Sequence, residues 1–486
     1  MKYDLKDQGK KISATEKIEE LKSLFCKSQD LLFKEHQFEQ GKVTMVFFES
    51  LIDTQYLDKF ILPRLDIFTE KPVIQKFQAY FQIENLTDQD QEHILSSLFT
   101  GYVLFFVEDV IFGVQAGSLP KRDPEESALE TSIRGPKDGF VEDLYTNISL
   151  VRRRIFSPSL CVEKYIVGSR SKTKVAILYL DDVLDERVLV ELHKRLEKIE
   201  IDVLVSNEEL ESLIGDSPYS IFPGFDYTGR PDFIVESLNQ GRFAIMVDGC
   251  PTVSFAPVNL LLQTKSPEDS NINYFFVSIE RLIRMSGLLI SGFLPGIWVA
   301  FSAYNLEQIP YLLVATISMS RFGLPLSAPV EMFIVLFLFE FFNEAGVRLP
   351  RAIGQTVSVL GGLIVGDAAI RAGLTSPTML VVGAITYISS FTLVNQSLKN
   401  GLTILRFIVL LLSTLFGLFG VILSFVVTIL YLATKSSFGV PYLGSAAPIS
   451  LTESLRAYLK LPLQFYKDRT KSTSPSDSER KGNEGS

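Results

Sequence analysis

The chain has 486 residues, with 47 Lys and Arg against 56 Asp and Glu, and a formal net charge of −9. Only 11 charged residues, or 7%, fall between Ser286 and Ala433, whereas the rest of the chain is 27% charged. This split excludes a wholly soluble enzyme, a disordered chain and a nucleic-acid binder that relies on bulk positive charge. It predicts a soluble region followed by an α-helical, multi-pass membrane domain.

The N-terminus has no apolar core of the kind a secretory signal needs, so we expect the front half to stay in the cytoplasm. Three cysteines and three histidines are scattered along the chain. They form no disulfide framework and no metal-ligand spacing, so we predict neither a metal site nor a cofactor.

The front half contains an internal repeat. Residues 42–53 align with 174–185 at an offset of 132, and residues 97–107 align with 237–247 at an offset of 140. Each copy starts with an apolar run typical of a strand covered on both faces, continues through helices, and ends in a strand entered through a glycine turn. Two tandem, related α/β subdomains are therefore predicted, with chance similarity of two apolar strands as the alternative.

The predicted boundaries follow from this repeat. They are an N-terminal extension at 1–35, subdomain 1 at 36–130, a connecting motif and helix at 131–158, and subdomain 2 at 159–280. The connecting helix is predicted over Val141–Ile155, because its apolar residues recur every three or four positions. Arg152, Arg153 and Arg154 lie at its C-terminal end, where the helix dipole favours cations. The simplest alternative is a solvated connecting helix.

The membrane domain is predicted over 281–434, with about five spans near Ser286–Tyr304, Ala328–Ala345, Ile353–Gly373, Ser376–Ser397 and Ile404–Ala433. Ile309–Met319 is too short to span, so it is predicted to be interfacial or re-entrant. A membrane-proximal segment at 435–469 and a disordered tail at 470–486 follow.

The positive-inside rule places two loops on the cytoplasmic side, one holding Arg348 and Arg351 and the other holding Lys399 and Arg406. Five spans would put the basic C-terminal segment on the opposite side. Alternatively, the last apolar stretch bends at Gly417–Gly420 and returns.

Acidic residues inside the apolar region are candidates for an ion path or a gate. Glu340 and Glu344 are four apart, so they share one helix face, and carboxylates in apolar spans usually face a protein interior or a water-filled cavity. The alternative is that they lie near the end of the span and pair with Arg348 and Arg351.

A stripe of small residues follows at a spacing of four, formed by Gly354, Ser358, Gly362 and Gly366, and it lets helices approach closely. Asp367 and Arg371 come next at the same spacing. The stripe and this pair are candidates for the lining of a pore between subunits, or for a tight packing seam with a structural ion pair. No phosphate loop, dinucleotide fingerprint, nucleophile elbow or metalloprotease pair is present, so we predict no enzymatic activity.

Several separated motifs resemble the A subunits of GerA-type spore germinant receptors. The first includes Arg134, Gly135, Pro136 and Glu142 and continues through Asn147 to Arg152–Arg154. The others are Phe293–Gly296, the segment Glu340–Gly373, and Ser437–Leu443. The chain differs from the usual family pattern at Asp367, where Gln is frequent, and at Arg371, where Glu is frequent.

The resemblance implies a protein of the inner membrane of a bacterial spore, with its front half on the core side. It implies two partners, a transporter-like B subunit that binds the nutrient and a C-subunit lipoprotein, and no nucleic acid. It also implies that A subunits oligomerise into a nutrient-gated ion channel. In that case the motif from Arg134 to Arg154 would join the two lobes or dock on a neighbouring subunit.

Two other hypotheses remain from the sequence. In the first, the lobes form a ligand-binding or scaffolding module that the membrane part only anchors. A secondary transporter is the third hypothesis, and it is disfavoured because the membrane part shows no repeat of its own.

Overall fold

A computed structural model describes residues 14–38, 41–64, 81, 83–87, 89–107, 110–116, 130, 132–348, 366–444, 458–462, 469, 473 and 475–477. The chain forms two compact units. The first comprises Met1–Pro218, Tyr227–Pro257 and Tyr466–Ser486, and the second comprises Tyr219–Asp226 and Val258–Phe465. The backbone therefore crosses from one unit to the other four times.

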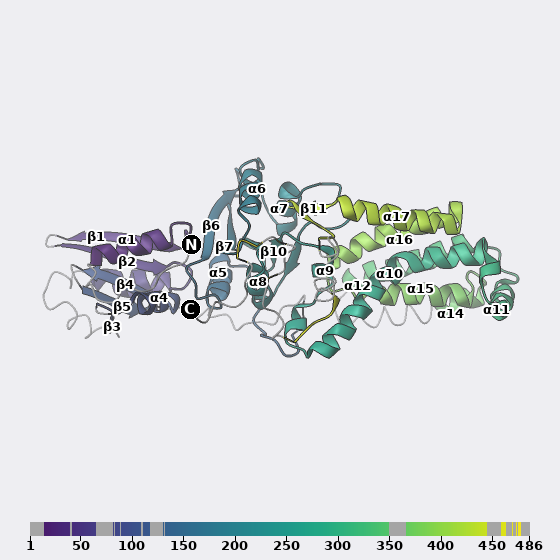
Figure 1. The fold of residues 1–486 in the computed structure, drawn as a ribbon, viewed down its shortest axis with the longest axis horizontal. Helices are drawn as coiled ribbons and strands as arrows, with labels where there is room; N and C mark the ends of the chain where they lie inside the picture. The colour runs from purple at the N-terminus through teal and green to yellow at the C-terminus, as the bar shows by residue number, and fades with distance from the viewer. Residues whose placement is uncertain are drawn as a thin grey trace. The chain divides into compact units, whose positions relative to one another are not determined.

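The first unit contains two five-stranded antiparallel sheets (Figure 1). In the first lobe the strand order is β1 (Leu31–Phe38), β2 (Gly41–Phe48), β4 (Tyr102–Val107), β5 (Val110–Gln115) and β3 (Ile83–Asn85). In the second lobe the order is β6 (Leu160–Val167), β7 (Thr173–Leu180), β9 (Phe243–Val247), β10 (Val253–Ala256) and β8 (Asp226–Thr228). The two orders are the same when the strands of each lobe are counted along the chain.

Strand register reproduces the sequence repeat. Val43 is opposite Val107 in the first sheet, and Val175 is opposite Val247 in the second. These pairs are related by the offsets of 132 and 140, and Met45–Phe105 and Ile177–Ile245 follow the same rule. Gly101 and Gly241, which precede β4 and β9, both have a positive φ, of 88° and 76°. The prediction of two related α/β subdomains is therefore confirmed.

Helices cover both faces of the first sheet, as the continuous apolar runs predict. Residues of α1 (Ala14–Leu24) and α4 (Gln91–Phe99) pack with Val46 and Phe48 on one face. Residues of the π-helical turn η1 (Leu57–Ile61), which follows α2 (Thr54–Tyr56), pack with Met45 and Phe47 on the other. The second lobe carries α5 (Leu144–Arg152), α6 (Glu186–Leu196), α7 (Asn207–Ile214) and α8 (Pro231–Leu238).

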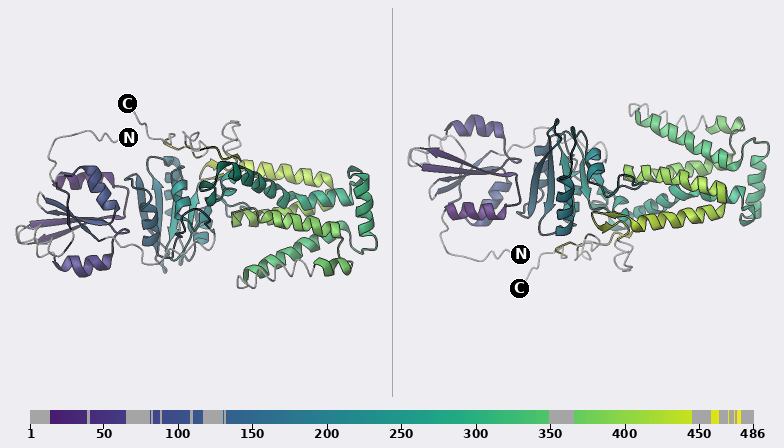
Figure 2. Two further views of the ribbon diagram at one scale, coloured as in Figure 1. Left: turned by 90° about the horizontal axis from the view of Figure 1, so that it is seen from below. Right: turned by 90° about the horizontal axis from the view of Figure 1, so that it is seen from above.

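The second unit is mainly helical, and Figure 2 shows its long helices running side by side. Its elements in chain order are α9 (Leu260–Gln263), η3 (Pro267–Ser270), α10 (Tyr274–Ala303), η4 (Leu306–Gln308), α11 (Tyr311–Arg321), α12 (Ala328–Arg348), α14 (Gly366–Arg371), α15 (Pro377–Ser390), α16 (Gln396–Phe416), α17 (Leu418–Thr434), β11 (Ser436–Ser437) and β12 (Val440–Pro441). Among the described residues, α10 and α16 are long and apolar enough to cross a bilayer, and α15 and α17 are shorter apolar helices.

Several helix bounds differ from the predicted spans. Helix α10 starts at Tyr274, twelve residues before the predicted span, because its first three turns are amphipathic rather than uniformly apolar. The stretch predicted as one span from Ile404 is divided at Gly417, where φ is +59°. Ile309–Met319 corresponds to α11, an 11-residue helix with an exposed apolar surface.

The break at Gly417 produces a helical hairpin. A Cβ on Gly420 would clash with the carbonyl oxygen of Leu412, so α16 and α17 touch through their backbones beside the turn. At the opposite end, Gly401 of α16 and Tyr431 of α17 both contact Ile221. The chain therefore returns to the end from which α16 started, as in the alternative that placed a bend at Gly417–Gly420.

Part of the tail predicted to be disordered is bound to the second lobe. Ser476 donates from its backbone N–H to the Val183 carbonyl at 3.0 Å and from its hydroxyl to the Leu184 carbonyl at 3.0 Å. Thr473 donates to the Gln240 carbonyl at 2.8 Å. Backbone acceptors on the lobe thus hold a segment whose composition alone gives no sign of order.

Candidate functional site

The two lobes of the first unit are joined through the buried side chain of Arg152. This residue ends α5, which packs on the second sheet, and it is fully buried together with Asp30. Its Nη2 donates to both carboxylate oxygens of Asp30 at 2.8 Å and to Ser28 Oγ at 2.9 Å. Its Nη1 donates to the Leu160 carbonyl at 2.9 Å. One guanidinium therefore links the segment before β1 to the start of β6.

Other contacts support this lobe junction. The guanidinium lies 4.6 Å from the centroid of the Phe48 ring, which adds a cation–π contact. Lys164 and Glu49 form an ion pair at 2.6 Å, and Gln29 bonds to the backbone of β6 through both its N–H and its side chain. Lys27 and Asp181 form a further, more exposed ion pair at 2.5 Å, and the hydrogen bond with Asp181 raises the pKa of Lys27.

The rest of the predicted motif has divided roles. Asn147 is buried, and its amide both donates to the Val141 carbonyl at 2.6 Å and accepts from the Val141 N–H at 2.8 Å. Arg154 forms a two-oxygen contact with Asp138 at 2.7 and 2.5 Å. In contrast, Arg134, Pro136, Glu142 and Arg153 are exposed, and Gly135 is half-buried. The sequence alone could not separate the buried arginine from its two neighbours, because all three lie at the end of one amphipathic helix.

Within the second unit, the segment Tyr219–Asp226 is held by residues at the ends of both helices of the hairpin, α16 and α17. Asn395, the N-cap of α16, donates to Asp226, and a Cβ on Gly401 would lie 2.5 Å from the Ile221 carbonyl oxygen. Lys435, just after α17, bonds to Ser220 and to the Phe222 carbonyl. We call residues 219–226 the collar segment. Both of its ends continue directly into the first unit, so it is a covalent connection between the lobes and the hairpin.

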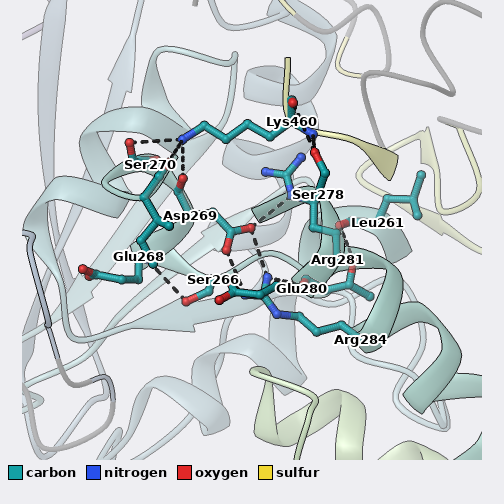
Figure 3. A network of polar contacts seen from close by, with 12 residues as sticks. Leu261, Ser266, Glu268, Asp269, Ser270, Ser278, Glu280, Arg281, Arg284 and Lys460 are labelled. Carbon is teal, nitrogen blue, oxygen red and sulfur yellow. Dashed lines mark hydrogen bonds and ion pairs between the residues drawn. The ribbon is translucent and has the colours of Figure 1, made fainter. Parts of the chain in front are cut away.

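A charged network lies where α10 begins (Figure 3). Asp269 of η3 accepts from Arg281 Nε at 3.1 Å and from Arg284 Nη1 and Nη2 at 3.0 and 2.9 Å. Lys460 Nζ donates to the carbonyls of Asp269 and Ile272 at 2.5 and 2.9 Å. Both arginines are buried. They lie outside the predicted spans, so counting charges within the apolar stretch did not reveal the network.

The predicted ion-path acids lie on α12 in different surroundings. Glu340 is half-buried, and its carboxylate interacts electrostatically with Lys399 and Arg406. Glu344, one turn later, is exposed. Both carboxylates face the same side of the helix, as the spacing of four predicts, but only Glu340 is near described cations of α16.

The prediction that Lys399 and Arg406 lie in a loop is wrong. Both belong to α16, and Arg406 is almost completely buried, with Nε donating to the Ser291 carbonyl of α10 at 2.8 Å. Among the described residues, its Nη2 has no hydrogen-bond partner. The positive-inside rule treats a cation as a mark of the membrane surface, which fails when the helix bundle buries the cation.

The sequence reasoning also missed Glu331. Its side chain is fully buried in the first turn of α12, and it accepts from the Ser376 N–H, at the start of α15, at 3.0 Å. Arg321 Nη2 of α11 lies 3.4 Å from its other oxygen. A carboxylate beside a helix N-terminus and a guanidinium is stabilised by both, and Glu331 therefore connects three helices. Its signal in the sequence is an acid in the first turn of an apolar helix.

Only one residue of the small-residue stripe lies within the described residues. Gly366 is buried, and a Cβ there would lie 3.1 Å from Leu380 of α15, so it contacts that helix closely. Gly354, Ser358, Gly362 and Arg351 lie outside the described residues, and Arg348 is the last residue of α12. Asp367 and Arg371 form an ion pair at 2.8 Å, with side chains that are 59% and 79% exposed.

The first unit has two lobes with the same strand order and a buried ionic junction, and the second has apolar helices with charged side chains buried between them. Together these features define a membrane protein with a paired α/β region. The chain matches the family described as Bacillus/Clostridium GerA spore germination protein over residues 19–472. It therefore belongs to the GerA spore germination family, and the recognition made from the motifs is confirmed. Membership of this non-enzymatic family also confirms that the chain is not an enzyme.

Individual relatives are similar over most of the chain. Spore germination protein XA of Bacillus anthracis is 40% identical over 88% of this chain and 89% of the relative. Spore germination protein KA of Bacillus subtilis is 34% identical over 97% of this chain and 88% of the relative. The crystal structure of the N-terminal domain of the A subunit of the Bacillus megaterium germinant receptor GerK3 is 25% identical. The match covers 52% of this chain and 98% of the crystallised chain, with a TM-score of 0.39.

Proposed function

We propose that the chain is the A subunit of a nutrient germinant receptor in the inner membrane of the spore, and that its copies assemble into a nutrient-gated ion channel. Charged side chains buried within the apolar helices carry the proposal. Arg406 and Glu331 are each at most 1% exposed, and burying ionised groups in a membrane domain is costly enough that such groups usually serve an ion path or a switch. In the complex, the B subunit binds the nutrient and the C subunit is a lipoprotein.

Glu340 and Glu344 of α12 have different roles in this proposal. The Glu340 carboxylate interacts electrostatically with Arg406 and Lys399, so in this proposal Glu340 helps to position α12 against α16 and contributes little net negative charge to a passing cation. Glu344 lies one turn nearer to the end of α12 and is exposed to solvent, so in this proposal it contributes to the potential at the mouth of the passage together with the groups around it. Attraction of a cation to an exposed carboxylate is screened by salt, so this contribution falls as ionic strength rises.

The collar segment is the proposed link between the lobes and the hairpin. Both helices of the hairpin contact it, through Asn395 and Gly401 at the start of α16 and through Lys435 after α17. A displacement of residues 219–226 therefore changes the packing of α16 and α17 together. The proposed gate has a closed and an open arrangement of these helices. Nutrient bound by the partner subunit shifts the balance between them only if it binds one arrangement more tightly than the other.

The test is cation flux from vesicles that contain the complete receptor, recorded on addition of nutrient. We expect Glu344→Gln to lower the flux at low salt and to have less effect at high salt. Glu340→Gln should change gating and assembly, because Arg406 then loses its nearby countercharge. Asp367→Asn is the matched control, since that carboxylate is exposed and paired with Arg371. Wild-type flux and selectivity in Glu344→Gln would remove Glu344 from the path, and wild-type gating and assembly in Glu340→Gln would contradict the positioning role of Glu340.

A further inference from the structure

The start of α10 carries an apolar stripe that is exposed in the structure. Phe275, Phe276, Ile279, Leu282 and Ile283 are 65%, 66%, 57%, 52% and 51% exposed. Their spacing places them on one side of the helix, and exposed Leu289 continues the same side into the apolar part of α10. A patch of large apolar side chains on a surface element marks a contact with another molecule or with lipid.

The opposite side of the same turns is fixed by the charged network of Figure 3. Arg281 and Arg284 are bound to Asp269, and the backbone N–H of Lys460 donates to Ser278 Oγ at 3.1 Å. These contacts hold the helix in one rotation about its axis. The apolar stripe therefore points away from η3 and from the segment around Lys460, and it cannot turn inward without breaking the ion pairs.

The length of α10 indicates what the stripe meets. Thirty helical residues span about 45 Å, whereas the hydrocarbon core of a bilayer is about 30 Å thick. About ten residues must then lie beyond the core if the remaining apolar part spans it. The turns that carry the stripe are the ones at the end where Arg281 and Arg284 lie, so they fall at the level of the lipid headgroups.

We propose that residues 274–283 form a membrane-surface anchor, with the stripe inserted at the boundary between headgroups and acyl chains. The arginines beside it are already paired, because Arg281 and Arg284 bind Asp269 and Arg284 also binds Glu280, while Lys460 Nζ donates to backbone carbonyls. Anchoring therefore depends on apolar burial rather than on attraction to anionic lipid. The network orients the stripe and thereby sets the depth and rotation of α10 at the membrane surface.

The proposal is tested by spin-label accessibility in the full-length chain, with Cys26, Cys161 and Cys250 replaced by Ser. Labels are placed at Phe276→Cys, at Leu415→Cys on the exposed apolar side of α16, and at Arg170→Cys in the second lobe. The protein is reconstituted in phosphatidylcholine vesicles. Collision rates with oxygen, which enters lipid, and with a water-soluble nickel chelate are then compared.

We expect the ratio of oxygen to nickel collisions at position 276 to be several-fold above that at position 170 and to approach that at position 415. The ratio should not change when phosphatidylglycerol is added. A ratio equal to that at position 170 would overturn the anchor, and low collision rates with both reagents would overturn it by showing that protein covers the stripe. Ile279→Cys provides a second label should Phe276→Cys fold poorly.

This inference rests on α10 lying in the membrane and not on ion conduction, so it can fail while the proposed channel stands. The label at Leu415 distinguishes failure of the anchor from failure of membrane insertion, because it reports insertion of the helical unit independently of the stripe, whereas the channel is tested separately by cation flux.

Discussion

Two buried arginines, one in each unit, show how differently the protein uses the same side chain. Arg152 makes ionic and hydrogen-bonded contacts with Asp30, Ser28 and the Leu160 carbonyl, and it is enclosed with its countercharge. Arg406 donates to one backbone carbonyl, and among the described residues its Nη2 has no hydrogen-bond partner. A fully paired buried charge fixes one arrangement, whereas a buried charge with an unsatisfied donor is held by fewer contacts and contributes less to the stability of its unit.

This contrast predicts that the larger loss of stability follows replacement at the lobe junction, while the switching role of the helical unit belongs to the proposed function. Replacing Arg152 would leave Asp30 buried and unpaired, so its loss cannot be absorbed by rearrangement. Replacing a group near Arg406 should disturb the contact that this side chain makes between α16 and α10.

The largest effect is expected for Arg152→Met. Removing one partner of a buried ion pair costs about 3–5 kcal/mol, so peptides from both lobes should exchange backbone hydrogens much faster in the variant. Arg153→Met is the matched control, because that neighbouring side chain is exposed and its loss should change stability by less than about 0.5 kcal/mol. Equal exchange in the two variants would contradict a role for Arg152 in joining the lobes.

A smaller loss is expected when the hairpin is forced apart. Gly420→Ala places a Cβ against the backbone of Leu412, and overpacking of this kind costs about 1–3 kcal/mol. The melting temperature of the detergent-solubilised protein should fall by a few degrees. Gly224→Ala is the control within the same unit, since no heavy atom lies within 4 Å of its added Cβ. A Gly420→Ala variant as stable as Gly224→Ala would argue against the close crossing of α16 and α17.

The second lobe also contains a buried carboxyl group that is hydrogen-bonded to a neutral serine hydroxyl. Burial raises the pKa of Glu211 to about 7, while Ser254 donates to its carboxylate at 2.5 Å. A raised acid pKa means that the folded lobe holds the proton more tightly than the unfolded chain. Stability from this group is therefore complete below pH 4.5 and is lost as the pH rises toward 7.

Glu211→Gln should remove that pH dependence and leave the lobe about 2 kcal/mol more stable than wild type at pH 8. Hydrogen exchange of peptides from α7 and β10 at pH 5 and pH 8, corrected for intrinsic rates, measures it. Identical pH dependence in wild type and variant would show that the carboxyl group is solvated.

The smallest effect is expected at Asp367 and Arg371. Their side chains are mostly exposed, and exposed ion pairs contribute about 0.2–1 kcal/mol, less at high salt. Asp367→Asn should therefore leave assembly and nutrient-triggered flux close to wild type. A large loss of flux with intact assembly would instead place this carboxylate in the ion path.

Much of the soluble fold could be predicted, because repeated strands carry their register with them. The offsets of 132 and 140 in the sequence reappear as the pairs Val43–Val107 and Val175–Val247. The helical unit was less predictable for a physical reason. Hydropathy averages the charge of a segment and does not report which side of a helix meets protein, so Arg406 was placed in a loop and Glu331 was overlooked.

The same limit applies to the candidate site. Spacing correctly placed Glu340 and Glu344 on one face, but only the packing of α12 against α16 distinguishes their surroundings. The collar segment carries no motif, because its contacts are mostly with backbone atoms. The collar segment can be recognised only in the folded structure, where Asn395, Gly401 and Lys435 meet around it.

The oligomeric state of the full-length chain in lipid nanodiscs is the decisive quantity for the proposed channel. The described helices of one copy are too few to enclose a wide aqueous path, so we predict a defined homo-oligomer that persists on dilution, measured by the mass of single particles. A strictly monomeric chain, in a receptor that still releases cations when nutrient is added, would contradict the proposal that copies of this subunit form the passage.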